Sequence, residues 1–197
     1  MARRTRAEML EETRAKLLAA ARKAFAEKGF AEASMDELTA SAGLTRGALY
    51  HHFGDKKGLL AAVVEQVDTE MAARAHAQVM AQNPASDWEA LLAEGLAYIE
   101  LALDPEIQRI VLKDGPAYLG DPSEWPSQNG CLVKSIEALE GLMAKGTIRP
   151  CDAEAVARLI NGAALDAAQW VAASDDPQAA LPKAQEALGL LLRGLKA

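Results

Sequence analysis

The 197-residue sequence is poor in the residues that typify disulfide-rich and metal-binding proteins. It contains two cysteines and three histidines, and aromatic residues make up 5% of the chain. Cys131 and Cys151 do not form a Cys-x-x-Cys pair, so we expect both thiols to stay reduced; the alternative is a redox switch through them. No group of His and Cys has the spacing of a metal site, and we expect neither a metal nor another cofactor.

Long apolar runs are also missing. No uninterrupted apolar stretch approaches the roughly 18 to 20 residues that a bilayer span requires, and no apolar signal segment follows the basic start of the chain. We therefore expect a cytoplasmic protein that has no membrane partner.

Common enzyme motifs do not occur in the sequence. It has no Gly-x-Ser-x-Gly, no His-Glu-x-x-His and no phosphate-binding Gly-rich loop. His51 and His52 are adjacent, and adjacent side chains on a helix point about 100° apart, which is a poor geometry for holding one metal ion. We therefore expect a binding protein and not an enzyme.

Acidic residues outnumber basic ones, and the formal net charge of -7 is unfavourable for binding nucleic acid. The charge is unevenly divided along the chain. Residues 1–60 contain 11 Lys and Arg against 8 Asp and Glu, whereas residues 61–197 contain 10 against 20. A basic N-terminal part on an acidic remainder is the asymmetry expected when only the N-terminal part meets DNA.

The basic part contains the pattern of a short helix followed by a glycine turn. Ser34 and Glu37 have the spacing of a capping box, which predicts that a helix begins at Met35. Apolar residues follow helical spacing up to Ala42, and Gly43 is placed to end the helix in a left-handed conformation.

A second short helix is predicted over residues 46–53. Thr45 is a suitable N-cap, and Leu49 and Phe53 are four residues apart, so both would face the core. The remaining surface combines a basic side chain, a glycine that permits close approach, a phenol and an imidazole, which suits a major groove flanked by phosphates. These outward residues are Arg46, Gly47, Tyr50 and His51.

Two further basic features flank this pair of helices. Asp55 can cap the next helix, which places Lys56 and Lys57 in its first turn, where lysines oppose the helix dipole and an external anion would explain them. An arginine arm ahead of the first helix would reach into an adjacent minor groove, unless it is simply a solvated terminus: Arg3, Arg4 and Arg6.

These residues resemble the N-terminal domain of the TetR family of bacterial transcriptional regulators. The similarity covers roughly residues 10 to 65, and its most specific part is the Gly-x-Leu-Tyr-His-His-Phe run over residues 47–53. It implies an all-α protein in which a three-helix helix-turn-helix domain (residues 1–58) precedes a larger helical domain for ligand binding and dimerisation (residues 59–197). It also implies phosphate contacts and a groove-facing surface, and the predicted DNA-binding residues are Ser34, Thr45, Arg46, Gly47, Ala48, Tyr50, His51 and Lys56.

The rest of the chain has the apolar periodicity of helices. One helix continues from Leu59 to beyond Val67 and would link the two domains, and others are predicted around residues 88–99, 107–111, 132–143, 155–173 and 179–195. Between them, residues 114–130 contain six Gly and Pro residues, which predicts a long irregular segment that is either mobile or functional.

The resemblance implies a pocket for a small organic ligand in the second domain. Asn161 and Gln169 are informative candidates, because amides on an otherwise apolar helix need polar partners. Tryptophans in the same region could instead fill the core, and charged residues could lie on the surface. The full set of candidates is Tyr98, Arg109, Tyr118, Trp125, Asn161, Asp166, Gln169 and Trp170.

Two C-terminal patterns bear on assembly. Residues 156–173 are rich in Ala and Gly, and residues 181–195 carry a broad leucine face; both surfaces could pack within the monomer. The resemblance favours a homodimer through a four-helix bundle, and a two-fold dimer would read a near-palindromic operator with half-sites about 34 Å apart. We expect a repressor that a small organic ligand releases from its operator; the alternatives are an activator or a helical protein-protein interaction module.

Overall fold

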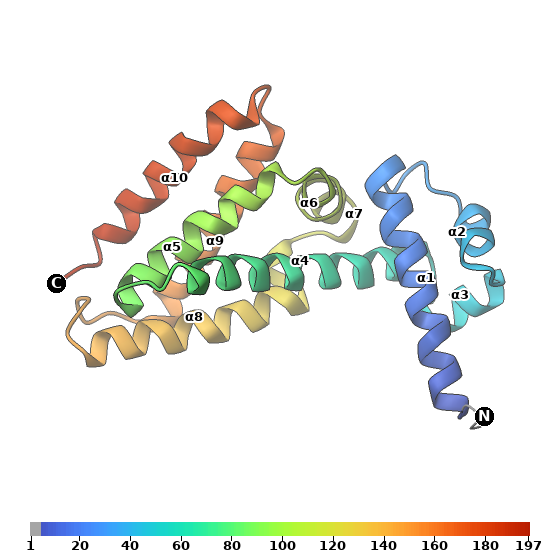
Figure 1. Ribbon diagram of the computed structural model, residues 1–197, viewed down its shortest axis with the longest axis horizontal. Coiled ribbons are helices and arrows are strands. Elements are labelled where there is room, and N and C mark those ends of the chain that lie inside the picture. The colour runs from blue at the N-terminus through green and yellow to red at the C-terminus, as the bar shows by residue number, and fades with distance from the viewer. Residues whose placement is uncertain (1–4) are drawn as a thin grey trace.

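The structure is a computed structural model that describes residues 5–197, and its regular elements are helices. Helices α1 to α3 form one end of the molecule, here called the head, and α5 to α10 form the other end, the body (Figure 1). The expected all-α fold with a small N-terminal and a larger C-terminal part is confirmed. The main helices are α1 (Arg6–Lys28), α2 (Met35–Ala42), α3 (Arg46–Phe53), α4 (Lys56–Ala81), α5 (Asp87–Glu100), α8 (Pro126–Ala144), α9 (Ala153–Ala173) and α10 (Pro177–Arg193).

The head is held by one apolar core that all of its helices share. Leu17 and Phe25 of α1, Leu38 of α2 and Leu49 of α3 are fully or almost fully buried. Helices as short as α2 and α3, with eight residues each, are marginal on their own, so this shared burial is what stabilises them.

Helix α4 links the head to the body without a break (Figure 1). Asp55 caps it by accepting a hydrogen bond from the backbone N–H of Gly58 at 2.7 Å. Its buried stripe extends from Leu59 to Val79, so the same helix contributes to both cores. The predicted domain division at residues 58 and 59 falls in the first turn of α4, and it stays a prediction.

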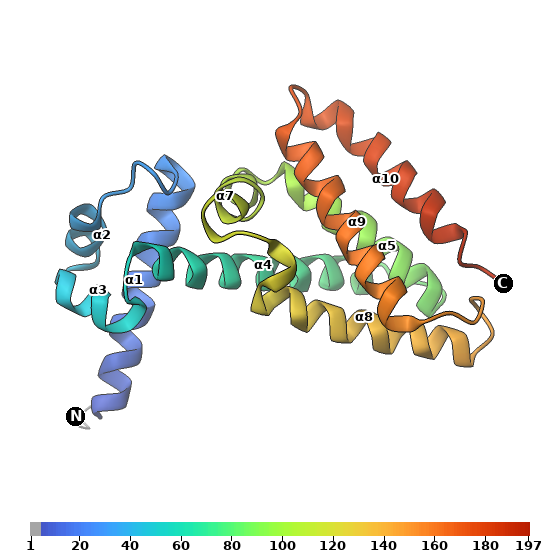
Figure 2. The ribbon, with the colours of Figure 1, turned by 180° about the vertical axis from the view of Figure 1, so that it is seen from behind.

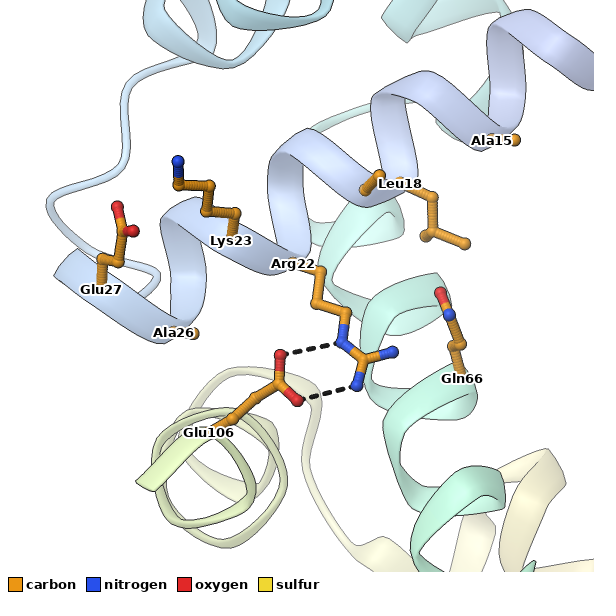
Figure 3. Close-up of a pocket in the computed structure, with 9 residues that line it drawn as sticks. Ala15, Leu18, Arg22, Lys23, Ala26, Glu27, Gln66 and Glu106 are labelled. Atoms are coloured by element: carbon orange, nitrogen blue, oxygen red, sulfur yellow. Dashed lines mark hydrogen bonds and ion pairs between the residues drawn. The ribbon is translucent and has the colours of Figure 1, made fainter. Parts of the chain in front are cut away.

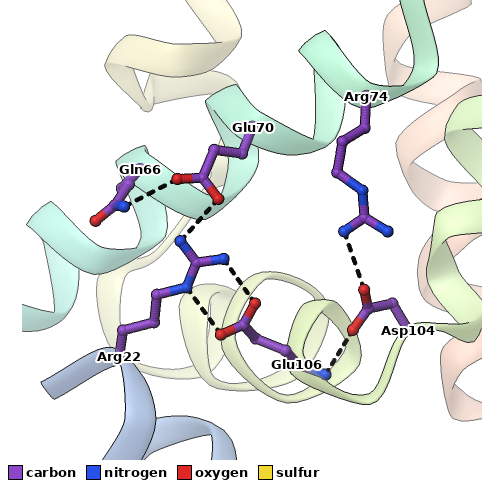
Figure 4. A network of polar contacts seen from close by, with 6 residues as sticks. All are labelled: Arg22, Gln66, Glu70, Arg74, Asp104 and Glu106. Carbon is purple, nitrogen blue, oxygen red and sulfur yellow. Dashed lines mark hydrogen bonds and ion pairs between the residues drawn. The ribbon is translucent and has the colours of Figure 1, made fainter. Parts of the chain in front are cut away.

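A polar network fixes the head against the body (Figure 4). Arg22 of α1 donates two hydrogen bonds to Glu106, on the short helix α6 (Pro105–Ile107), and one to Glu70 of α4, at 2.7 to 2.8 Å. Arg74 of α4 pairs with Asp104, whose other carboxylate oxygen accepts the backbone N–H of Glu106. Three helices therefore meet at one guanidinium.

A second contact lies at the end of α1. The backbone N–H of Phe30 donates to the carboxylate of Asp114 at 2.7 Å, and the Phe30 ring lies 4.5 Å from the ring of Tyr118. Asp114 ends the π-helix η2 (Gln108–Asp114), and Tyr118 lies on α7 (Gly115–Leu119). Movement of η2 or α7 would therefore displace or break a contact with Phe30 of the head.

The prediction of a long irregular segment over residues 114–130 is wrong. This stretch contains α7, the 3-10 helix η3 (Pro122–Glu124) and the first turn of α8. Pro122 and Pro126 each begin a helix, where the missing N–H would have no intrahelical partner in any case, and Pro116 is the second residue of α7. Gly115 is needed for packing, because a Cβ there would lie 2.6 Å from the ring of Trp125.

Helices α9 and α10 pack side by side, with α9 against α5 (Figure 2). Their buried faces include Ala168 and Leu188, while large apolar side chains remain on the outside. Within the described residues, no helix has the length and apolarity needed to cross a membrane. The most exposed apolar side chains of the two helices are Leu159, Trp170, Leu190 and Leu191.

Candidate nucleic-acid interface and buried polar site

The predicted helix-turn-helix forms with the expected caps. The Ser34 hydroxyl accepts the backbone N–H of Glu37, Gly43 ends α2 with a φ of 66°, and the Thr45 hydroxyl accepts the backbone N–H of Ala48. The second half of the predicted capping box is replaced, because the Glu37 carboxylate pairs with Lys28 at 2.9 Å. The turn between α2 and α3 is therefore fixed by local hydrogen bonds, independently of any partner.

One face of α3 is left open. Leu49 is fully buried, whereas Tyr50 is 53% exposed and Arg46, Gly47 and His51 are also exposed. Ser34 and Thr45, at the starts of α2 and α3, are exposed as well, and Ala48 is half-buried. Seven of the eight predicted DNA-binding residues therefore lie on α3 or at the starts of α2 and α3, and six of them are exposed; their contact with DNA stays a prediction.

Arg46 has a partner on α2. Its Nε and Nη2 atoms both donate to the Asp36 carboxylate, and both side chains are largely exposed. The guanidinium lowers the pKa of Asp36, and the carboxylate raises the pKa of Arg46. The sequence analysis did not select Asp36. The available signal was its acidic side chain, which lies near the N-cap of α2 on a surface otherwise suited to DNA.

Lys56, the eighth nominated residue, is placed differently. Its ammonium donates to the carbonyl of Ala31 at 3.3 Å and lies 4.4 Å from the centre of the Phe30 ring. Burial lowers the pKa of Lys56. The lysine thus holds the turn after α1 in place, and its predicted phosphate contact remains untested.

The predicted arginine arm is described only in part. Arg3 and Arg4 lie outside the described residues, and Arg6 is the first residue of α1. The hydroxyl of Thr5 caps α1 by accepting the backbone N–H of Glu8.

An open groove of about 540 Å³ runs beside α1, with the Arg22–Glu106 ion pair at its base (Figure 3). Methyl groups of α1 form much of its wall, and the Lys23 side chain points away from Glu106. None of the eight ligand candidates lines this groove.

The body contains a buried carboxyl group that sequence reasoning also missed. Asp68 of α4 is 1% exposed, and its oxygens accept hydrogen bonds from the Tyr98 hydroxyl of α5 at 3.4 Å and from the Gln128 amide of α8 at 2.9 Å. Burial raises the pKa of Asp68 and that of Tyr98. The available signal was a single acidic residue at helical spacing from Val64 and Met71 on the apolar stripe of α4.

Two more polar groups are buried near the start of α8. The indole N–H of Trp125 has no hydrogen-bond partner among the described residues, whereas the Ser127 hydroxyl interacts with Asp68 and lowers the pKa of that carboxyl group, against the larger effect of burial. Trp125 also lines a cavity of about 240 Å³ between α4 and the segment before α8. Buried donors without partners are unusual, so this junction has unused hydrogen-bonding capacity for a ligand.

The structure does not bring the eight ligand candidates together. Tyr98 and Trp125 both lie near the junction of α4 and α8, where Gln128 reaches Asp68. Asn161 accepts a hydrogen bond from Ser135 at 3.0 Å between α9 and α8. The others lie elsewhere: Arg109 beside Gly29 of the head, Tyr118 against Phe30, Gln169 half-buried on α9, and Asp166 and Trp170 exposed on α9.

Within residues 5–197, no group of three or more His, Cys, Asp or Glu side chains is placed to hold a metal ion. Both cysteines are free thiols.

Comparison with known proteins identifies the chain. Residues 17–63 match the model of bacterial regulatory proteins of the tetR family, and residues 88–195 match that of the tetracyclin repressor-like C-terminal domain. The chain belongs to the TetR family of transcriptional regulators. The crystal structure of a TetR-family transcriptional regulator from Pectobacterium atrosepticum has 52% sequence identity and a TM-score of 0.87, and the match covers 98% of each chain.

Curated transcriptional regulators match part of the chain. The transcriptional regulator TtgR of Pseudomonas putida is 35% identical over 112 residues, which are 56% of this chain and 52% of TtgR. The chain thus spans about half the length of the Pseudomonas putida regulators that it matches first. RolR, whose structure was solved with the ligand resorcinol, is 20% identical with a TM-score of 0.69, covers 96% of this chain and 95% of its own, and shares the fold.

Proposed function

We propose that this TetR-family protein is a transcriptional repressor that binds a near-palindromic operator as a homodimer and is released by a small organic effector. The observation that carries the proposal is the open face of α3. Its apolar side is sealed in the head core through Leu49, while Arg46, Tyr50 and His51 project from a helix whose start is fixed by Thr45. A rigid helix with such a surface fits a major groove.

Assembly as a homodimer is supported by the outer face of α9 and α10. Leu159 is 74% exposed and Leu191 is 68% exposed, although both lie on helices whose other faces are well buried. A cluster of exposed large apolar side chains on adjacent helices is typical of a protein interface. A second copy of the chain would cover it and set two α3 helices on successive turns of DNA.

Release by an effector is supported by the buried polar site around Asp68. That site joins α4, α5 and α8, and the indole N–H of Trp125, which has no partner among residues 5–197, lies at the start of the same helix α8. Because α4 also carries the head, a molecule that opens this junction would change the position of α4 and hence of α3. We therefore propose that Tyr98 and Trp125, two of the predicted ligand-binding residues, contact the effector at this junction.

The test of the proposal is the salt dependence of binding to a mixed-sequence DNA duplex, followed by fluorescence anisotropy. Phosphate contacts predict that the logarithm of the association constant falls linearly and steeply with the logarithm of salt concentration. The matched variant Tyr50→Ala/His51→Ala changes two exposed side chains outside the core and should bind more weakly at every salt concentration. Binding that ignores salt, or that the double variant leaves unchanged, would overturn the proposal and favour a protein partner for the head.

A further inference from the structure

The pair formed by Asp36 and Arg46 joins the two helices of the helix-turn-helix. Asp36 lies in the first turn of α2 and Arg46 is the first residue of α3, so ten positions of sequence separate them. The carboxylate receives two parallel hydrogen bonds, from Nε and from Nη2. A bidentate contact fixes the plane of a guanidinium as well as its position.

The way in which Asp36 is bound leaves one edge of Arg46 available. A guanidinium carries five N–H groups, which form a side edge (Nε and Nη2) and an end edge (Nη1 and Nη2). Asp36 occupies the side edge. The end edge makes no hydrogen bond to another residue within 5–197, and the Arg46 side chain is 57% exposed.

The charge of Asp36 also requires an explanation. A carboxylate 71% exposed on a surface that faces DNA would repel phosphates unless a cation neutralised it. Arg46 supplies that cation, and the phosphate attraction of Arg46 is reduced in return. The pair therefore contributes little to the general affinity for DNA. Its contribution would instead be the fixed orientation of the Arg46 guanidinium.

We propose that Asp36 is a positioning residue that orients Arg46 so that the end edge of its guanidinium reads one guanine in each half-site of the operator. This inference rests on the proposed DNA-binding function and adds a base and a residue to it. Guanine presents O6 and N7 as two adjacent acceptors in the major groove, which match two parallel N–H donors. Adenine presents N7 beside the N6 amino group, which is a donor. One N–H of Arg46 would then face another donor and have no acceptor.

The first test uses an operator selected from random DNA. It compares the affinity of the protein for this operator with its affinity for the same operator in which the proposed guanine of each half-site is replaced by adenine. Native protein should prefer guanine by about tenfold or more, the range expected for one good bidentate contact. Arg46→Ala should lose this preference. Asp36→Ala should reduce it several-fold and at the same time bind mixed-sequence DNA more tightly, because a negative charge has been removed near the phosphates.

That opposite response separates positioning from a role in folding alone. A substitution that merely damaged the head would weaken binding to every duplex. Glu37→Ala is the matched control, since Glu37 is the neighbouring exposed carboxylate on α2 and pairs with Lys28 instead of Arg46. Its guanine preference should equal that of the native protein.

A second test changes the DNA and leaves the protein intact. Replacing the guanine by 7-deazaguanine removes the N7 acceptor while keeping base pairing. Native protein should lose several-fold in affinity, and Arg46→Ala should not respond. A native protein that tolerates 7-deazaguanine, or an Asp36→Ala variant with native guanine preference, would overturn this inference while leaving DNA binding intact. Failure of the native protein to bind any duplex would instead overturn the proposed function.

Discussion

Arg22 of α1 and Glu106 of α6 form a bidentate ion pair, with nitrogen-oxygen distances of 2.8 and 2.7 Å, at the point where the head meets the body. The third nitrogen of the same guanidinium binds Glu70 of α4 at 2.7 Å. The two carboxylates raise the pKa of Arg22 well above its ordinary value. A change in the body that moves either α4 or α6 must therefore move or break a contact with α1.

Substitution of Arg22 tests the contribution of this network to stability. Arg22→Ala leaves Glu70 and Glu106 close together without their shared cation, and we expect it to lower the free energy of unfolding by about 1 to 2 kcal/mol, because the groups are partly exposed. For a chain of this size the melting temperature should fall by roughly 2 to 8 °C. Lys23→Ala, an exposed neighbour on α1, is the control. Equal melting temperatures for the two variants would show that the network does not stabilise the fold.

Two residues of α3 are expected to play different parts in DNA binding. Tyr50→Ala would remove the predicted phosphate contact and should weaken binding to all sequences about equally, by roughly 1 to 3 kcal/mol. Arg46→Ala should weaken binding and also relax the preference among sequences. Affinities of both variants for the operator and for a scrambled duplex provide the measurement, and an equal loss of preference in both would contradict this division.

The outer face of α9 and α10 predicts a change of oligomeric state. Leu191→Asp places a charge within the proposed interface and should convert the proposed dimer to a monomer in analytical ultracentrifugation at micromolar concentration. Val133→Asp on α8 is the control, because Val133 is 55% exposed but lies outside that face. A Leu191→Asp protein that still sediments as a dimer would place the interface elsewhere.

Asp68 predicts a pH-dependent effect on stability. Burial raises the pKa of Asp68, so the folded protein binds this proton more tightly than the unfolded chain does. The buried charge lowers the free energy of unfolding above the folded-state pKa, and this effect disappears as pH falls below the ordinary carboxyl range near 4. Asp68→Asn keeps one acceptor for Gln128 and should raise the melting temperature by a few degrees at pH 7.5.

The same comparison near pH 4 completes this test. The advantage of Asp68→Asn over the native protein should shrink there, since the raised pKa of Asp68 means that its carboxyl group gains its proton as the pH falls. Asp166→Asn, an exposed position on α9, should show no such trend. A difference that stays constant with pH would mean that the charge of Asp68 does not oppose folding.

The helices of the head could be predicted from sequence because their signals are local. Ser34, Gly43 and Thr45 act within three or four residues of their own positions, and each adopts the predicted role. The contact between Asp36 and Arg46 could not be predicted in this way, because it depends on the angle between α2 and α3. That angle is set by the packing of the head core around Leu38 and Leu49.

The body was harder to predict for the same reason. Gly and Pro within residues 114–130 indicated a loop, but proline is compatible with a first helical turn, and the glycine at 115 serves the close approach of Trp125. The sequence marked Asn161 and Gln169 as amides on an otherwise apolar helix but could not say which neighbouring helix covers them. In the structure α8 does so at Asn161, through Ser135.

The most direct test of the central claim is selection of bound duplexes from a random DNA pool, with Tyr50→Ala/His51→Ala selected in parallel. The account predicts that the native protein enriches a near-palindrome whose half-sites are about one helical turn apart, or a multiple of that, and that the variant does not. No enrichment by the native protein, or the same enrichment by the variant, would contradict the claim that α3 reads an operator.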